Sequence, residues 1–133
     1  MSMSTTPQSF PLSLRGLRGA TTCTANTTEA IEVAVDELIE MMIQRNALES
    51  DRVVSVLFSV TSDLNACFPA AVVRRRSGWD GVALLDCQQM AVDGDIHRCI
   101  RVLAHVWMPQ NRIPVHPYLG EAIQLRPDLS SYT

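Results

Sequence analysis

The sequence predicts an α/β (α+β) fold in which a mixed β-sheet is covered on one face by one long and one short helix. Strand-like stretches, either alternating or continuously apolar, are interspersed with one long stretch of helical periodicity. Two helices are few for such a sheet, so its second face should be buried by neighbouring subunits. The 133 residues suffice for one domain with a core of its own.

The N-terminal part should contain a tail and then a first strand. Residues 1–13 are polar and rich in Ser and Thr, which predicts a flexible tail and a single domain over 14–133. Residues 14–22 (LRGLRGATT) predict a strand. Its glycines, Gly16 and Gly19, leave space in which another backbone or a ligand can approach closely.

The next segments predict a long helix and a central strand. Apolar residues recur at helical spacing over 29–46, with Thr27 or Thr28 as the N-cap. Acidic residues occupy most of the opposite face, which is most simply solvated. The nearly continuous apolar run over 53–60 (VVSVLFSV) is typical of a strand covered on both faces.

The remaining elements are a short helix and two strands. Pro69 can begin a helix and Gly78 can end it, which predicts a helix over PAAVVRRRS. Residues 81–86 and 99–108 predict strands. In the second of these, Ile100, Val102, Ala104 and Val106 should line one face, and Arg101, Leu103, His105 and Trp107 the other. Three prolines follow, and residues 118–133 should form a short turn of helix and a tail.

Composition excludes several classes of function. The net charge of −3 argues against nucleic-acid binding. The chain has no lysine, which excludes a lysine Schiff base and a Walker phosphate loop, so arginine must bind any anion. No run of about 18 apolar residues and no signal-peptide pattern is present, which favours a cytoplasmic protein that does not bind a membrane. The four cysteines, without C-x-x-C spacing, are interpreted as free thiols.

Arginines are the candidate functional residues. Arg101 lies within a strand, and a buried guanidinium needs partners, so it is either a fixed donor facing a pocket or one member of a surface ion pair. Arg18, between two glycines, could bind a carboxylate bidentately, and Arg126 precedes a proline and could close over a ligand. Arg74 could reach a neighbouring site. The histidines lack metal-ligand spacing and no nucleophile motif occurs, so neither a metal nor a cofactor is expected.

Four segments together resemble the monofunctional AroH class of chorismate mutases. These are RGLRGATT, SVTSDLNACFPAAVVR, HRCIRV and PYLGEAIQLRPDLS, in the same order and at similar spacing, and they extend from about Leu14 to Ser130. The resemblance implies an enzyme that rearranges chorismate to prephenate without a cofactor. It also implies a homotrimer with a pseudo α/β barrel arrangement and active sites between adjacent subunits.

The resemblance also implies roles for individual residues. Arg101 corresponds to the arginine at the ether oxygen of chorismate, and Arg18 and Tyr118 to residues that hold a substrate carboxylate and neighbouring oxygens. Leu125 and Arg126 correspond to residues that help to close the cleft. The adjacent subunit would contribute three further residues, Phe68, Ala70 and Arg74.

The sequence departs from the family pattern at two places. The family usually has a glutamate that accepts a hydrogen bond from the substrate hydroxyl, and Gln89 stands there. Asp86, three residues earlier, is expected to supply the displaced carboxylate, balancing Arg101 and accepting that hydrogen bond, while Gln89 assists. In the other interpretation Asp86 ends its strand in solvent. Ala71 stands where relatives can carry a lysine, so electrostatic steering of the substrate should be weaker.

Two functions from other classes remain open at this point. A trimeric imine deaminase of the RidA type would also use arginine at a subunit cleft, but its single carboxylate needs one arginine where chorismate needs several. A non-catalytic binding protein, inactive because glutamine replaced glutamate, is the other alternative.

Overall fold

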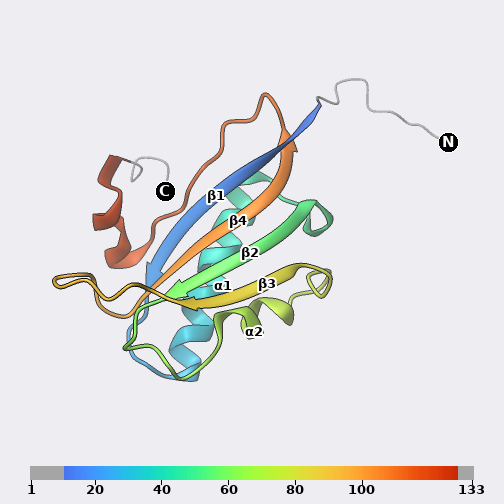
Figure 1. The fold of residues 1–133 in the computed structure, drawn as a ribbon. Helices are drawn as coiled ribbons and strands as arrows, with labels where there is room; N and C mark the ends of the chain where they lie inside the picture. Colours follow the sequence, from blue (N-terminus) through green and yellow to red (C-terminus); the bar gives the residue numbers. More distant parts are fainter. Residues whose placement is uncertain (1–10, 129–133) are drawn as a thin grey trace.

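The fold is a four-stranded mixed sheet with two helices on one face (Figure 1). The structure, a computed structural model, describes residues 11–128. The elements run in the order β1 (Leu12–Thr22), α1 (Thr28–Asn46), η1 (Ser50–Arg52), β2 (Val53–Val60), α2 (Pro69–Arg74), β3 (Ala83–Gln88), β4 (Cys99–Pro109) and η2 (Gly120–Leu125). The strands lie in the order β1-β4-β2-β3. This confirms the predicted mixed sheet with one long and one short helix.

Topology explains why both helices cover the same face. Strand β4 pairs antiparallel with both β1 and β2, so β1 and β2 are parallel to each other, and β2 is also parallel to β3. Helix α1 therefore connects one parallel pair and α2 the other, and both connections advance in the same direction across the sheet. Crossovers of this kind are right-handed in almost every protein, so both helices lie on one face and the other stays open.

The predicted boundaries hold closely. Strand β2 occupies the predicted residues, and Thr27 caps α1, its side chain accepting a hydrogen bond from the Ala30 backbone N–H. Strand β1 begins at Leu12, two residues before the predicted start, and the rest of the expected N-terminal tail lies largely outside the described residues. Helix α2 is shorter than predicted and ends at Arg74, and β3 begins two residues later than predicted.

The core lies between the helices and the sheet. The apolar stripe of α1 is buried and packs against alternate residues of the strands, including Leu17, Phe58, Val102 and Val106. The alternation predicted for β4 is confirmed: Ile100, Val102, Ala104 and Val106 are buried. All four cysteines are free thiols, as expected. No helix in the described part of the chain is long and apolar enough to cross a membrane.

The acidic face of α1 is not simply solvated, as the sequence had suggested. Arg75 forms an ion pair with Glu32 at 2.8 Å, and Arg76 forms ion pairs with Asp36 at 3.6 Å and Glu40 at 2.6 Å. These two arginines follow the last residue of α2. They therefore join the end of α2 to the outer side of α1 and are not available to a distant site.

The second face of the sheet is open except at one end. There the C-terminal segment folds back, and Tyr118 and Ala122 pack on Ala20 and Cys99 to form a second, smaller core. Elsewhere this face exposes large apolar side chains, which are unusual on a sheet face that only contacts solvent. They are Leu14, Leu85, Leu103 and Trp107. The part of the face next to the second core is where the candidate site lies.

Candidate functional site

Neighbouring strands place the candidate residues in rows across the open face. Arg101 of β4 lies directly opposite Ala20 of β1 and Ser59 of β2, and Ser59 pairs in turn with Cys87 of β3. Residues opposite one another on paired strands project from the same face. Arg101 is thus flanked by small side chains, which leaves room above it.

The next row along the sheet contains Arg18. It pairs with Leu103, which pairs in turn with Leu57 of β2. Arg18 and Arg101 therefore project from one face on adjacent strands, two residues apart in register. The sequence placed them more than eighty residues apart, and the β1–β4 pairing brings them together.

A cavity of about 480 Å³ lies over these two rows. Three arginines line it, from β1, β4 and the end of η2. The C-terminal segment closes one side with Tyr118 and Leu125. The complete lining is Arg18, Gly19, Leu57, Phe58, Ser59, Cys87, Arg101, Val102, Leu103, Tyr118, Leu125 and Arg126. A concave, largely apolar site with a few convergent cations suits a small organic anion.

Arg101 is held on one side only. Its Nη2 donates to Asp95 Oδ1 at 3.2 Å, in an ion pair whose two side chains are 25% and 21% exposed. Its Nη1 is buried and has no hydrogen-bond partner among the described residues. A buried cationic donor without an acceptor is costly, and such a group marks a place where a ligand can supply the missing acceptor.

Arg18 and Arg126 also line this cavity. The Arg18 backbone N–H donates to Nδ1 of His116 at 3.0 Å. Burial of His116, together with the positive charges of Arg18 and Arg126, lowers the pKa of its imidazole. His116 is therefore neutral at neutral pH and accepts this hydrogen bond. Arg126 donates to both carboxylate oxygens of Asp128, at 3.0 and 2.7 Å.

Gln89 reaches the same face through Ser59. Alternation along β3 continues past its end, so Gln89 is on the side of Leu85 and Cys87. The Ser59 hydroxyl donates to Oε1 of Gln89, and the Gln89 backbone N–H donates to the Val60 carbonyl at 2.7 Å. Because Ser59 is the cross-strand neighbour of Arg101, the amide lies close to the predicted catalytic arginine.

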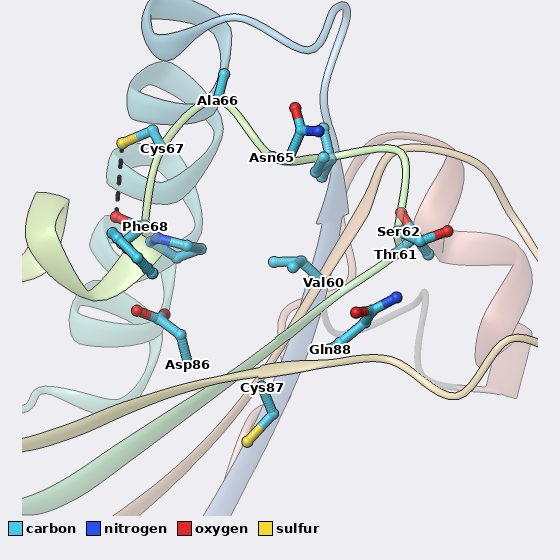
Figure 2. Close-up of a pocket in the computed structure, with 12 residues that line it drawn as sticks. Val60, Thr61, Ser62, Asn65, Ala66, Cys67, Phe68, Asp86, Cys87 and Gln88 are labelled. Atoms are coloured by element: carbon cyan, nitrogen blue, oxygen red, sulfur yellow. Dashed lines mark hydrogen bonds between the residues drawn. The ribbon is translucent and has the colours of Figure 1, made fainter.

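Asp86 lies on the other face of β3. Its Oδ1 accepts a hydrogen bond from the Ala70 backbone N–H at 3.0 Å, in the first turn of α2. Figure 2 shows its carboxylate directed toward Phe68, whereas Cys87 points to the opposite side of the strand. Burial raises the pKa of Asp86, opposed by this hydrogen bond and by the charge of Arg74. Within one chain Asp86 therefore does not balance Arg101, contrary to the expectation from the sequence. Asp95 forms that ion pair instead.

A second cavity of about 470 Å³ adjoins Asp86 (Figure 2). It is lined by the segment from Val60 to Pro69 and by the end of β3, and Phe68 is 71% exposed beside it. Ala70 is buried, so its side chain belongs to the core while its backbone faces Asp86. Cys87 borders both cavities, which places them on the two sides of the end of β3.

The structure thus divides the predicted site residues into two groups. Arg18, Arg101, Tyr118, Leu125 and Arg126 line the first cavity, with Gln89 beside it. Phe68, Ala70 and Asp86 lie at the start of α2, and Arg74 is its last residue, close enough for its charge to act on Asp86.

Sequence reasoning missed Asp95 and Ser59. In the stretch AVDGDI nothing distinguishes Asp95 from Asp93, because the turn that aims one of them at Arg101 is tertiary. Alternation within β2 would have placed Ser59 on the face of Leu57, but it gives no strand partner.

The comparison with known proteins decides the family. A sequence profile described as chorismate mutase type I matches residues 14–129. The chain belongs to the type I chorismate mutase family. It is 44% identical over 119 residues to chorismate mutase AroH of Bacillus subtilis, covering 88% of this chain and 93% of that protein. It is 43% identical over 122 residues to chorismate mutase AroH of Thermus thermophilus, covering 89% and 98%.

A solved structure extends the similarity to the fold. The chorismate mutase from Clostridium thermocellum superposes with a TM-score of 0.74 at 37% identity, covering 81% of this chain and 96% of that one. Membership of the type I chorismate mutase family agrees with the resemblance found in the sequence motifs. The match includes all the residues of the arginine-lined cavity.

Proposed function

We propose that this chain is a chorismate mutase that converts chorismate to prephenate in the biosynthesis of phenylalanine and tyrosine, with the cavity around Arg101 as part of its active site. The observation that carries the proposal is Nη1 of Arg101, a buried donor with no acceptor among the described residues. Membership of the family indicates the reaction. The unpaired donor of Arg101 indicates where in the cavity the positive charge that the reaction needs is located.

The reaction requires a positive charge near the ether oxygen of chorismate. A [3,3] rearrangement transfers no proton and needs no nucleophile, but breaking the C–O bond leaves negative charge on the ether oxygen. A fixed cation beside that oxygen stabilises the transition state more than the ground state. In a site shielded from water one such donor is worth about 3 to 4 kcal/mol, or about 10²- to 10³-fold in rate.

The remaining arginines suit the two carboxylates of chorismate. Arg18 and Arg126 lie in the same cavity as Arg101. By holding the carboxylates they would keep the enolpyruvyl chain over the ring, which is the orientation that the rearrangement needs. A RidA-type imine deaminase binds one small carboxylate and needs one arginine, so three arginines around one cavity favour chorismate.

The open face of the sheet supports a homotrimer in which neighbouring copies complete the site. Leu85, Leu103 and Trp107 are 56%, 37% and 43% exposed in the single chain, an apolar surface that association would bury. The Phe68 and Asp86 group would then approach the arginine cavity of an adjacent copy. The trimeric pseudo α/β barrel and the cytoplasmic location stay predictions.

Turnover is the direct test of this function. Purified protein is mixed with chorismate and the loss of its absorbance is followed, with Arg101→Ala as the test variant. We expect saturable turnover that falls by at least about 10²- to 10³-fold in the variant. Arg52→Ala is the matched control, since Arg52 forms a surface ion pair with Glu49 outside the cavity. Absence of turnover in the folded wild-type protein would favour a non-catalytic binding protein.

Asp86 has a separate test. If an adjacent copy brings its carboxylate to the substrate hydroxyl, Asp86→Asn should lower kcat/KM by about tenfold, the size expected for a hydrogen bond to a charged group. The amide oxygen of asparagine can still accept from the Ala70 backbone N–H, so α2 should remain in place. A kcat/KM near the wild-type value would assign Asp86 to capping α2 alone.

A further inference from the structure

We propose that Asp95 is a positioning residue of this site, which holds the Arg101 guanidinium through Nη2 and leaves Nη1 for the substrate. The inference rests on the proposed function and deepens it. The ion pair between Arg101 Nη2 and Asp95 Oδ1, at 3.2 Å, is the observation that carries it.

The chain fixes Asp95 from its N-terminal side by a tight turn. Its backbone N–H donates to the Val92 carbonyl at 3.1 Å. Gly94, just before it, has φ of +83°, a backbone conformation that favours glycine. This turn reverses the chain after β3 and brings the carboxylate of Asp95 back toward β4, where Arg101 lies.

The residues after Asp95 are also anchored. Ile96 packs on the second core, which contains Tyr118, and its backbone N–H donates to Asp95 Oδ1 at 2.8 Å. Further on, the Arg98 backbone N–H donates to the carboxylate of Asp63 at 3.0 Å, and its side chain donates to the Cys23 carbonyl at 3.1 Å. The carboxylate of Asp95 is therefore a fixed group rather than the end of a free loop.

Asp95 provides the negative charge beside Arg101, because the neutral Gln89 stands where the family usually has a glutamate. Of the three arginines that line the cavity, Arg126 is already paired with Asp128, and the amide of Gln89 cannot offset the charge of Arg101. The Ile96 backbone N–H, and then Arg101 itself, lower the pKa of Asp95. Asp95 is therefore ionised at neutral pH. An ionised partner restricts the flexible Arg101 side chain to one orientation before the substrate arrives, which is how a charge-assisted hydrogen bond adds geometric specificity.

Asp95 and a substrate oxygen would bind different terminal nitrogens of Arg101, so they do not compete for the same donor. If Asp95 blocked the site, the donor needed by the substrate would already be occupied. Nη2 takes the carboxylate while the buried Nη1 keeps its hydrogens unused. Asp95 can therefore remain bound to Arg101 while a substrate oxygen binds Nη1, and its role is to orient the guanidinium.

The test compares Asp95→Asn and Asp95→Ala with Asp93→Asn. Asp93 is exposed and lies in the same turn. Asp93→Asn removes one negative charge, as Asp95→Asn does, and so serves as the matched control. We expect each Asp95 variant to lower kcat about tenfold, with KM changed less than threefold, and Asp93→Asn to match the wild type. In an Arg101→Lys background, Asp95→Asn should have little further effect, because the guanidinium that it positions is gone.

Two kinetic results would overturn the proposal. A lower KM with higher kcat/KM in Asp95→Asn would show that Asp95 competes with the substrate. Full additivity with Arg101→Lys would show that Asp95 acts elsewhere, for example on the stability of the turn.

A measurement independent of turnover separates this proposal from the proposed function. NMR of the arginine side chains, with the Arg101 signals assigned from Arg101→Lys, reports rotation of the guanidinium. We expect slow rotation of Arg101 in the wild type and in Asp93→Asn, and fast rotation in Asp95→Asn. Equal rotation in all three would overturn the role of Asp95 even in an active enzyme. If the wild type has no mutase activity, slow rotation would still establish the positioning.

Discussion

Ser59 is the direct cross-strand neighbour of Arg101, and its hydroxyl donates a hydrogen bond to Gln89. One small polar residue thus connects the proposed catalytic arginine with the amide that stands at the usual glutamate position. The connection depends on three strands, β2, β3 and β4, meeting in one register. It explains how Gln89, which lies beyond the end of β3, comes to the arginine side of the sheet.

Replacing this hydroxyl should therefore affect catalysis. We expect Ser59→Ala to lower kcat/KM by about fivefold, since an ordinary hydrogen bond is worth about 1 kcal/mol and its loss frees the Gln89 amide. Steady-state kinetics measure this. Ser55→Ala is the matched control, because Ser55 lies on the same face of β2 and is hydrogen-bonded to His105, away from the cavity. Equal losses in both variants would contradict a specific role for Ser59.

Association through the open face can be tested at an edge strand. We expect Leu85→Glu to shift the protein from trimer to monomer and to lower mutase activity, because it places a charge on the apolar surface that neighbouring copies would bury. Sedimentation velocity over a range of concentrations measures the shift. Val33→Glu is the control, since Val33 is 69% exposed on α1 and should leave a trimer. A monomeric wild type would refute the trimer.

Gly19 is a position where an added side chain should be harmful, because backbone lies close to it. A Cβ atom there would lie 2.6 Å from the Pro117 carbonyl oxygen and 3.2 Å from Leu38 Cδ1. We expect Gly19→Ala to lower the free energy of unfolding by about 1 to 3 kcal/mol and to weaken substrate binding, because it displaces the segment that carries Tyr118. Urea unfolding checks the first effect. Gly81→Ala, where a Cβ atom meets open space, should be neutral.

Stability should fall in alkaline solution through two buried thiols. Burial raises the pKa of Cys23 and of Cys99 to about 11, from the ordinary 9.0. Because the folded pKa is the higher one, the stabilisation is complete below pH 9 and is lost as the pH rises toward 11. We expect a loss on the order of 2 kcal/mol for each thiol. Urea unfolding between pH 8 and 11 measures it.

The control for this titration is a variant with both thiols replaced by alanine. The chain has no lysine, which leaves cysteine and tyrosine as the side-chain types that ordinarily titrate in this range. The variant should show a flatter dependence of stability on pH than the wild type. The same slope in both proteins would mean that other groups, such as tyrosine, cause the loss.

Much of the fold could be predicted from local patterns. The apolar stripe of α1, the continuous run of β2 and the alternation of β4 each specify an element by period and by the faces that must be buried. Thr27 and Pro69 set helix starts through local backbone chemistry. The acidic face of α1 was misjudged, because its partners Arg75 and Arg76 come from a different element and only packing places them there.

The sequence by itself determined the family and the residues most suited to bind a dianion. Its motifs and its lack of lysine identified Arg18, Arg101 and Arg126, because residue type alone sets charge and hydrogen-bonding capacity. Tertiary structure decided which groups meet. The pairing of β1 with β4 places Arg18 and Arg101 at one cavity, and the alternation of side chains along β3 places Asp86 and Gln89 on opposite faces. The turn at Gly94 brings the carboxylate of Asp95 to Arg101. Contacts between distant segments depend on register and on chain reversal, and no local pattern encodes either of them.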